Sequence, residues 1–86
     1  MADGKKTKYE LKHPFEFEGV LIEDLDWREP RGREIRRMYN ITSGAGDRLS
    51  YIAAECCEVE QDMIDGLHAE DWAALTGALA GFLPSG

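Results

Sequence analysis

Two adjacent cysteines and two histidines are the side chains of this chain with the most versatile chemistry. Cys56 and Cys57 are neighbours, and His13 and His68 lie on either side of them. Zinc is commonly bound by thiolates and imidazoles, but its cysteine ligands are normally a few residues apart. Neighbouring side chains of a helix diverge by roughly 100°, which disfavours both a disulfide and a shared ion. We therefore interpret Cys56 as a small core residue and expect no metal.

The other candidates for catalysis also lack their usual neighbours. Gly44-Ala45-Gly46 is not followed by the Lys-Ser/Thr pair of a phosphate-binding loop. Neither histidine stands beside a candidate nucleophile, and the carboxylates have the spacing of a solvated surface. A domain this small rarely encloses a substrate pocket. We expect a protein that is not an enzyme and that has no cofactor.

A chain of 86 residues forms one domain with a modest core. We expect residues 1–7 to be disordered and residues 8–86 to form a single small α+β domain. No apolar run follows the lysine-rich start, and the longest nearly apolar stretch, 73–83, is far shorter than the roughly 20 residues of a membrane span. Free thiols suit a reducing compartment. These features favour a soluble protein of the cytoplasm, without membrane contact.

The charge is unevenly distributed along the chain. The net charge is -7, yet all ten Lys and Arg lie in residues 1–48, where ten acids balance them. Residues 49–86 carry seven acids and no Lys or Arg. An acidic surface repels phosphate, so we expect no nucleic-acid partner. The exception is a basic cluster made up of Arg28, Arg31, Arg33, Arg36 and Arg37. This cluster is either a solvated helix face or a contact to an acidic partner or a neighbouring subunit.

The segment 8–27 predicts a β-hairpin, because apolar and charged residues alternate along it. Glu18-Gly19 is the natural turn. His13-Pro14 interrupts the first strand, which indicates an edge or a bulge there. The alternation changes phase again in the second strand, so we expect a bulge near Glu23-Asp24.

A two-stranded hairpin is not stable alone, so helices must cover it. Three helical stripes follow: Ile35, Met38 and Tyr39; Ile52, Cys56, Val59 and Met63; and Trp72, Leu75, Leu79 and Phe82. Gly66 is expected to end the second helix and His68 to be a weak N-cap of the third. The predicted fold is α+β, an N-terminal two-stranded antiparallel hairpin packed on about three α-helices. The expected hairpin contacts are Phe15, Phe17, Val20, Ile22, Ile52, Val59, Trp72 and Leu75.

Two phrases of the sequence, taken in order, resemble a known family. The first is Pro14-Phe15-Glu16-Phe17-Glu18-Gly19 followed by Leu25-Asp26-Trp27-Arg28-Glu29-Pro30, and the second consists of Leu67, Asp71, Trp72, Leu75, Phe82 and Leu83. They resemble the tail assembly chaperones of contractile-tailed phages related to those of P2 and Mu. The resemblance implies a non-catalytic protein of a phage or prophage that binds the tape measure protein in the cytoplasm of the bacterial host.

A chaperone of this kind needs an exposed apolar surface for a helical partner, which we expect on the last helix. The predicted partner-binding residues are Trp72, Leu75, Leu79, Phe82, Arg31 and Arg36. The basic cluster and the acidic second half also predict self-association. The resemblance further implies a longer form made by a −1 ribosomal slip. Gly81-Phe82-Leu83 permits a slippery T-TTT-TTG heptamer near the end of the gene.

Two other readings stay open at this point. An acidic DNA mimic that inhibits a host nucleic-acid-binding protein would rest on the acidic second half, and its binding would fall steeply with salt. A structural virion component would remain in mature particles. A neighbouring long gene rich in predicted helix would favour the chaperone.

Overall fold

Strands β1 (Thr7–Phe17) and β2 (Val20–Trp27) form a two-stranded antiparallel hairpin. Four helices follow: α1 (Gly32–Tyr39), α2 (Ala45–Cys57), α3 (Gln61–Asp65) and α4 (Ala69–Ala80). This computed structural model describes residues 6–83. The α+β class and the N-terminal hairpin are confirmed. Of the expected disordered segment, residues 1–5 lie outside the described residues, whereas Thr7 pairs with Trp27 in the hairpin.

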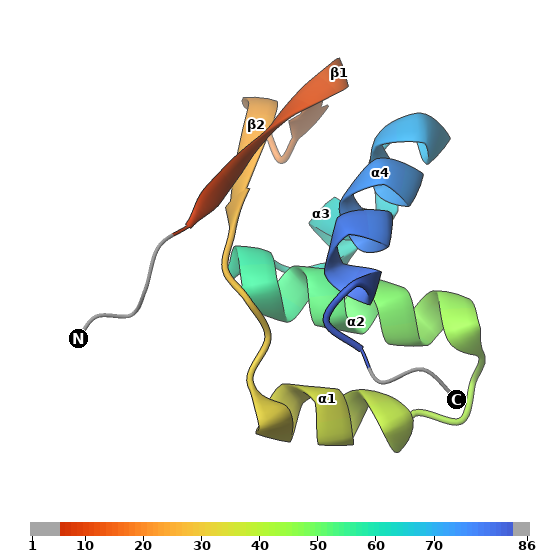
Figure 1. The fold of residues 1–86 in the computed structure, drawn as a ribbon. Helices are drawn as coiled ribbons and strands as arrows, with labels where there is room; N and C mark the ends of the chain where they lie inside the picture. The colour runs from red at the N-terminus through yellow and green to blue at the C-terminus, as the bar shows by residue number, and fades with distance from the viewer. Residues whose placement is uncertain (1–5, 84–86) are drawn as a thin grey trace.

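Helix α2 is the centre of the arrangement. It contacts α1, α3, α4 and β2, and α4 also contacts β1. Figure 1 shows the hairpin on one side of α2 and α1 on the other, with α4 crossing α2. The main contacts of the hairpin with the helices are therefore those of β2 with α2 and of β1 with α4.

The hairpin turn lies at Glu18 and Gly19, as predicted. Both residues have positive φ, at 52° and 83°. Positive φ at both central positions is the geometry of a type I′ turn, whose twist matches that of two antiparallel strands. Glycine adopts it without strain, whereas glutamate does not.

The two strands fall out of register near the middle of the hairpin. Glu10 pairs with Asp24, and the next regular pair is Phe15 with Ile22. β1 therefore has residues 11–14 where β2 has a single residue. The irregularity expected at His13-Pro14 is confirmed. The bulge was expected in the second strand, near Glu23-Asp24, and this is wrong, because the extra residues belong to β1. Pro14 of β1 has no N–H to donate to the ladder.

The predicted second helix is in fact two helices. The expected stripe ran without a break to Gly66, but α2 ends at Cys57 and Glu58 takes the left-handed conformation, with φ of 60°. The N–H of Val59 then donates to the carbonyl of Ala54 at 3.1 Å and closes the helix end. Glycine is the usual residue at such a position, so the sequence carries no signal for this break. Residues 6–83 contain four helices where about three were expected.

The core lies between α2, α4 and the inner face of the hairpin. Its completely buried apolar side chains are Ile52, Ala53, Cys56, Ile64, Leu75 and Leu79, all 0% exposed. Phe15, Ile22, Val59 and Trp72 pack against this core as expected. Two expected contacts are wrong: Val20 is 60% exposed, and Phe17 is only half-buried and lies outside the cluster. The buried strand residues are Leu11 and Leu25, which are 8% and 6% exposed, because the shifted register turns them inward.

Candidate functional site

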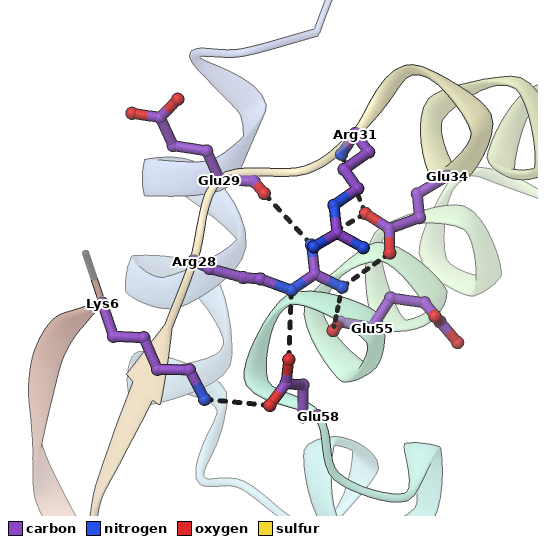
Figure 2. Close-up of polar contacts among 7 residues, drawn as sticks. All are labelled: Lys6, Arg28, Glu29, Arg31, Glu34, Glu55 and Glu58. Carbon is purple, nitrogen blue, oxygen red and sulfur yellow. Dashed lines mark hydrogen bonds and ion pairs between the residues drawn. The ribbon is translucent and has the colours of Figure 1, made fainter. Parts of the chain in front are cut away.

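Arg28 follows the last residue of β2, and its side chain lies between α1 and the end of α2 (Figure 2). Its two Nη atoms donate to the two carboxylate oxygens of Glu34, at 3.0 and 2.6 Å. Nη2 also donates to the carbonyl of Glu55 at 3.2 Å, and Nε to the carboxylate of Glu58 at 3.2 Å. The side chains of Arg28 and Glu34 are only 12% and 4% exposed. This buried bidentate pair fastens β2 to two helices.

The same cluster closes the start of α1 and the end of α2. The carboxylate of Glu34 accepts from the N–H of Arg31 at 2.8 Å, as in a capping box. The Arg28 guanidinium lowers the pKa of Glu34 in spite of burial, with help from the Arg31 N–H. Glu58 also accepts a hydrogen bond from Nζ of Lys6, at 2.9 Å, and forms an ion pair with it. The charges of this cluster are thus compensated within the fold.

Asp71 forms a second polar cluster, in the first turn of α4, and is completely buried. Its Oδ1 accepts from the Tyr9 hydroxyl at 2.8 Å and from the N–H of Lys12 at 2.9 Å. Its Oδ2 accepts from the N–H of His13 at 2.9 Å. Burial raises the pKa of this carboxyl, but the Lys12, Tyr9 and His13 donors together lower it below its ordinary value. A buried carboxylate therefore binds the irregular part of β1 to α4.

The imidazole rings of His13 and His68 stack beside this cluster, with centroids 3.7 Å apart and 17° between their planes. His68 is the N-cap of α4, because its Nδ1 accepts from the N–H of Glu70 at 3.0 Å. The predicted capping role is confirmed. Nε2 of His13 lies 2.9 Å from Oε1 of Glu70. Within residues 6–83, these three residues alone place three potential metal ligands within 4.8 Å of one another.

The geometry of these three residues suits capping and stacking better than metal binding. A histidine binds a metal through an in-plane lone pair of a ring nitrogen, and the one on Nδ1 of His68 already accepts a backbone N–H. The nearly parallel rings direct their lone pairs side by side and not toward one point. Cys56 and Cys57, which the sequence offered as further ligands, are buried in the core, and burial raises the pKa of their thiols to about 11 and about 12.

The six predicted partner-binding residues lie in two different environments. Leu75 and Leu79 are 0% exposed, and Trp72 is half-buried with its Nε1–H donated to Oγ of Ser50 at 3.0 Å. Phe82 is 41% exposed and meets Trp27 edge to face. Arg31, the N-cap of α1, and Arg36, on α1, are both exposed. In this conformation a partner can reach Phe82 and the two arginines directly.

The outward face of α4 was missed by the sequence analysis, which followed the apolar stripe. It is formed by small exposed residues: Ala73, Ala74, Gly77 and Ala78. Residues 72–83 contain no ionisable side chain. The signal was present in the sequence, since alanines one helical turn apart lie on one face. The result is a smooth, uncharged surface on a chain that is otherwise highly charged.

The described residues thus define a small α+β protein whose two buried polar clusters connect its own elements. None of its described helices is long and apolar enough to cross a membrane. A family model described as "Phage tail assembly chaperone proteins, E, or 41 or 14" matches residues 8–84. The chain belongs to this family of phage tail assembly chaperones, as its resemblance implied. No curated protein and no solved structure matches the chain.

The residues that carried the resemblance have structural roles in this fold. Arg28 closes the first phrase and joins β2 to α1 and α2. Asp71 belongs to the second phrase and joins α4 to β1. Gly19 provides the turn with positive φ. The two phrases therefore describe how the hairpin is attached, while the exposed face of α4 lies outside them.

Proposed function

We propose that this chain binds the tape measure protein during phage tail morphogenesis, in the cytoplasm of the bacterial host, and acts by binding and not by catalysis. Membership of the tail assembly chaperone family supports a role in tail assembly. The observation that carries the binding mode is the uncharged outward face of α4. Phe82, which follows the end of this helix, is also accessible, being 41% exposed.

An amphipathic helix of the partner fits this face physically. Small side chains allow two helices to approach closely, and alanine loses almost no rotamer entropy when it is covered. Phe82, exposed just beyond the end of α4, supplies an aromatic anchor near the face. Leu75, Leu79 and Trp72 hold the face in place from below, since they fix α4 on the core. Arg31 and Arg36 provide cations that steer acidic residues of the partner.

The experiment is co-expression of this chain with the tape measure protein of the same phage, followed by co-purification. Wild type should retain the partner at both low and high salt, because an apolar contact is not screened. Ala74→Glu and Ala78→Glu, both at exposed positions, should lose it. Gln61→Glu on α3 adds the same charge elsewhere on the surface and should bind like wild type.

The outcomes separate the chaperone from its alternatives. Folded Ala74→Glu and Ala78→Glu variants that still bind would remove the α4 face from the proposal. A wild-type chain that ignores the tape measure protein but captures a host nucleic-acid-binding protein in a salt-sensitive way would support the DNA mimic instead. Recovery of the chain in mature virions would indicate a structural component.

A longer form, made by a −1 ribosomal slip at Gly81-Phe82-Leu83, is part of the proposal on the family resemblance alone. Phe82 and Leu83 can be encoded by TTT TTG, and a GGT codon for Gly81 would complete the heptamer. Reading the DNA tests this directly. A TTC codon or a CTN codon eliminates this heptamer, and the absence of an overlapping −1 frame eliminates the longer form.

A further inference from the structure

A hollow of about 480 Å³ lies among α2, α3 and α4, beside the first turn of α4. Three polar side chains line it: Asp47, Ser50 and Asp65. Its apolar wall consists of Leu67, Ala69 and Trp72. Among the described residues, no Lys or Arg lines the hollow, and neither aspartate forms an ion pair. Two carboxylates thus share this hollow without a counter-charge.

The carboxylate of Asp65 is exposed, yet two hydrogen bonds in series hold its orientation. Nε1–H of Trp72 donates to Oγ of Ser50 at 3.0 Å, and this hydroxyl donates to Oδ1 of Asp65 at 2.8 Å. Ser50 is only 4% exposed, so water has little access to this series of bonds. Oδ2 of Asp65 accepts no hydrogen bond within the described residues. An acceptor that is already oriented loses less entropy when it binds a ligand than a freely rotating one does.

The lining of the hollow suits the long side chain of a lysine or an arginine. Its two carboxylates can accept from an ammonium or a guanidinium group. The aliphatic stem of the same side chain can cover Leu67 and Ala69, and the half-buried indole of Trp72 attracts a cation. A hard metal ion fits less well, because Mg²⁺ and Ca²⁺ require about six oxygen ligands and not an aromatic wall.

We propose that this hollow receives a lysine or arginine side chain of the helix that the tape measure protein places on the outward face of α4. The hollow is continuous with that face, because Ala69 in its wall lies one helical turn from the exposed Ala73. The face has no ionisable side chain, so it gives a partner helix no fixed register. A charged anchor at one end supplies that register. This inference rests on the proposed function and adds the partner residue that the surface selects.

The hollow can be tested without the tape measure protein, by NMR titration of the isotope-labelled chain with Nα-acetyl-argininamide at millimolar concentration and constant ionic strength. The indole N–H of Trp72 is the reporter, because it donates to Ser50 in the lining of the hollow. Its resonance should shift, whereas that of Trp27, which does not line the hollow, should not. The neutral Nα-acetyl-glutaminamide should move neither resonance. An unmoved Trp72 resonance, or an equal shift with the neutral probe or with magnesium chloride, overturns the inference.

Removal of the two charges tests the contact with the partner. Asp47→Asn/Asp65→Asn should weaken binding of the tape measure protein about tenfold at low salt, because the ion pair is lost while the apolar contact remains. The difference from wild type should shrink at high salt, since salt screens the ion pair of the wild-type complex. Asparagine at position 65 can still accept from Ser50, and urea unfolding checks that the variant is folded. Asp65→Asn alone replaces a double variant that does not fold.

A matched control, Glu16→Gln/Glu23→Gln, removes two charges from exposed positions of the hairpin and should bind like wild type. An equal loss of binding in this control would show that net charge governs the effect, which overturns the inference. Equal binding by wild type and by Asp47→Asn/Asp65→Asn at low salt also overturns it, but leaves the proposed function standing. A wild-type chain that does not bind the tape measure protein refutes the proposed function and, with it, the source of the basic side chain.

Discussion

The hydroxyl of Tyr9 donates a 2.8 Å hydrogen bond to Oδ1 of Asp71, although 62 positions separate the two residues in the chain. This bond joins β1 to the first turn of α4. Burial, and then the hydrogen bond and charge of Asp71, raise the pKa of the Tyr9 hydroxyl to about 12. The neutral phenol is therefore the form that the fold stabilises.

Tyr9→Phe should lower the free energy of unfolding by about 1–2 kcal/mol, because it removes one donor to a buried carboxylate and keeps the ring. Urea unfolding, followed by circular dichroism, measures the change. Tyr51→Phe is the matched control, since Tyr51 is also half-buried but its hydroxyl has no hydrogen bond within the described residues. The control should differ from wild type by less than about 0.5 kcal/mol. Equal effects of the two variants would contradict the assigned role of Asp71.

The sequence predicted the fold class well, because the relevant signals are local. The alternation in 8–27, the turn at Glu18-Gly19 and the His68 cap each depend on a few neighbouring residues. The interruption at His13-Pro14 was also visible, since proline cannot donate to a ladder. What this interruption does was not visible. It frees the N–H groups of Lys12 and His13 for a carboxylate nearly 60 residues away.

The two buried polar clusters could not be predicted for the same reason. In the sequence, Asp71 looks like any acid that the helix dipole favours in a first turn. Arg28 looks like one more arginine of a basic cluster. Only the tertiary arrangement distinguishes Arg28, whose side chain is 12% exposed, from Arg33, which is exposed. Likewise, the stripe of α4 indicated which residues are apolar, but Leu75 and Leu79 proved to face the core while the alanines face outward.

Arg28→Lys should lower the free energy of unfolding by about 2–3 kcal/mol, because lysine cannot reproduce the bidentate pair and leaves Glu34 buried with fewer donors. Arg33→Lys, on the exposed side of α1, should change it by less than about 0.5 kcal/mol. Chemical denaturation of both variants provides the comparison. A double-mutant cycle with Glu34→Gln should give a coupling energy of about 1 kcal/mol or more. Additive effects would refute a direct pairing.

Stability should fall on the acid side of a neutral plateau. The carboxyls of Asp71 and Glu34 both have pKa values below their ordinary ones. A lowered pKa contributes stability that is fully present above the unfolded value, about 4, and is lost as the pH falls through the folded value. The urea concentration at the unfolding midpoint should therefore decrease as the pH is lowered from 7, with most of the loss below about pH 4. Asp71→Asn, already destabilised at neutral pH, should show a shallower acid slope; an unchanged slope would contradict the assignment.

Stability should also fall at alkaline pH, because three groups have pKa values above their ordinary ones. The pKa of Tyr9 is raised from 10.0 to about 12, and those of Cys56 and Cys57 from 9.0 to about 11 and about 12. A raised pKa contributes stability that is present below the unfolded value and is lost as the pH rises through the folded one. Midpoints in the presence of a reductant should thus decline above pH 9. Tyr9→Phe should decline less between pH 10 and pH 12 than wild type does.

The hairpin turn offers a change that should stabilise the chain. Glu18 has φ of 52° and makes no ion pair or hydrogen bond within the described residues, so its side chain contributes nothing to offset the left-handed backbone. Asparagine tolerates this conformation far better, and Asn-Gly is the preferred pair of a type I′ turn. Glu18→Asn should raise the free energy of unfolding by about 0.5–1 kcal/mol. Gly19→Ala, at φ of 83°, should lower it by about 1–2 kcal/mol. Thermal and urea unfolding must show opposite signs for the two variants, and a loss of stability in Glu18→Asn would contradict the turn geometry.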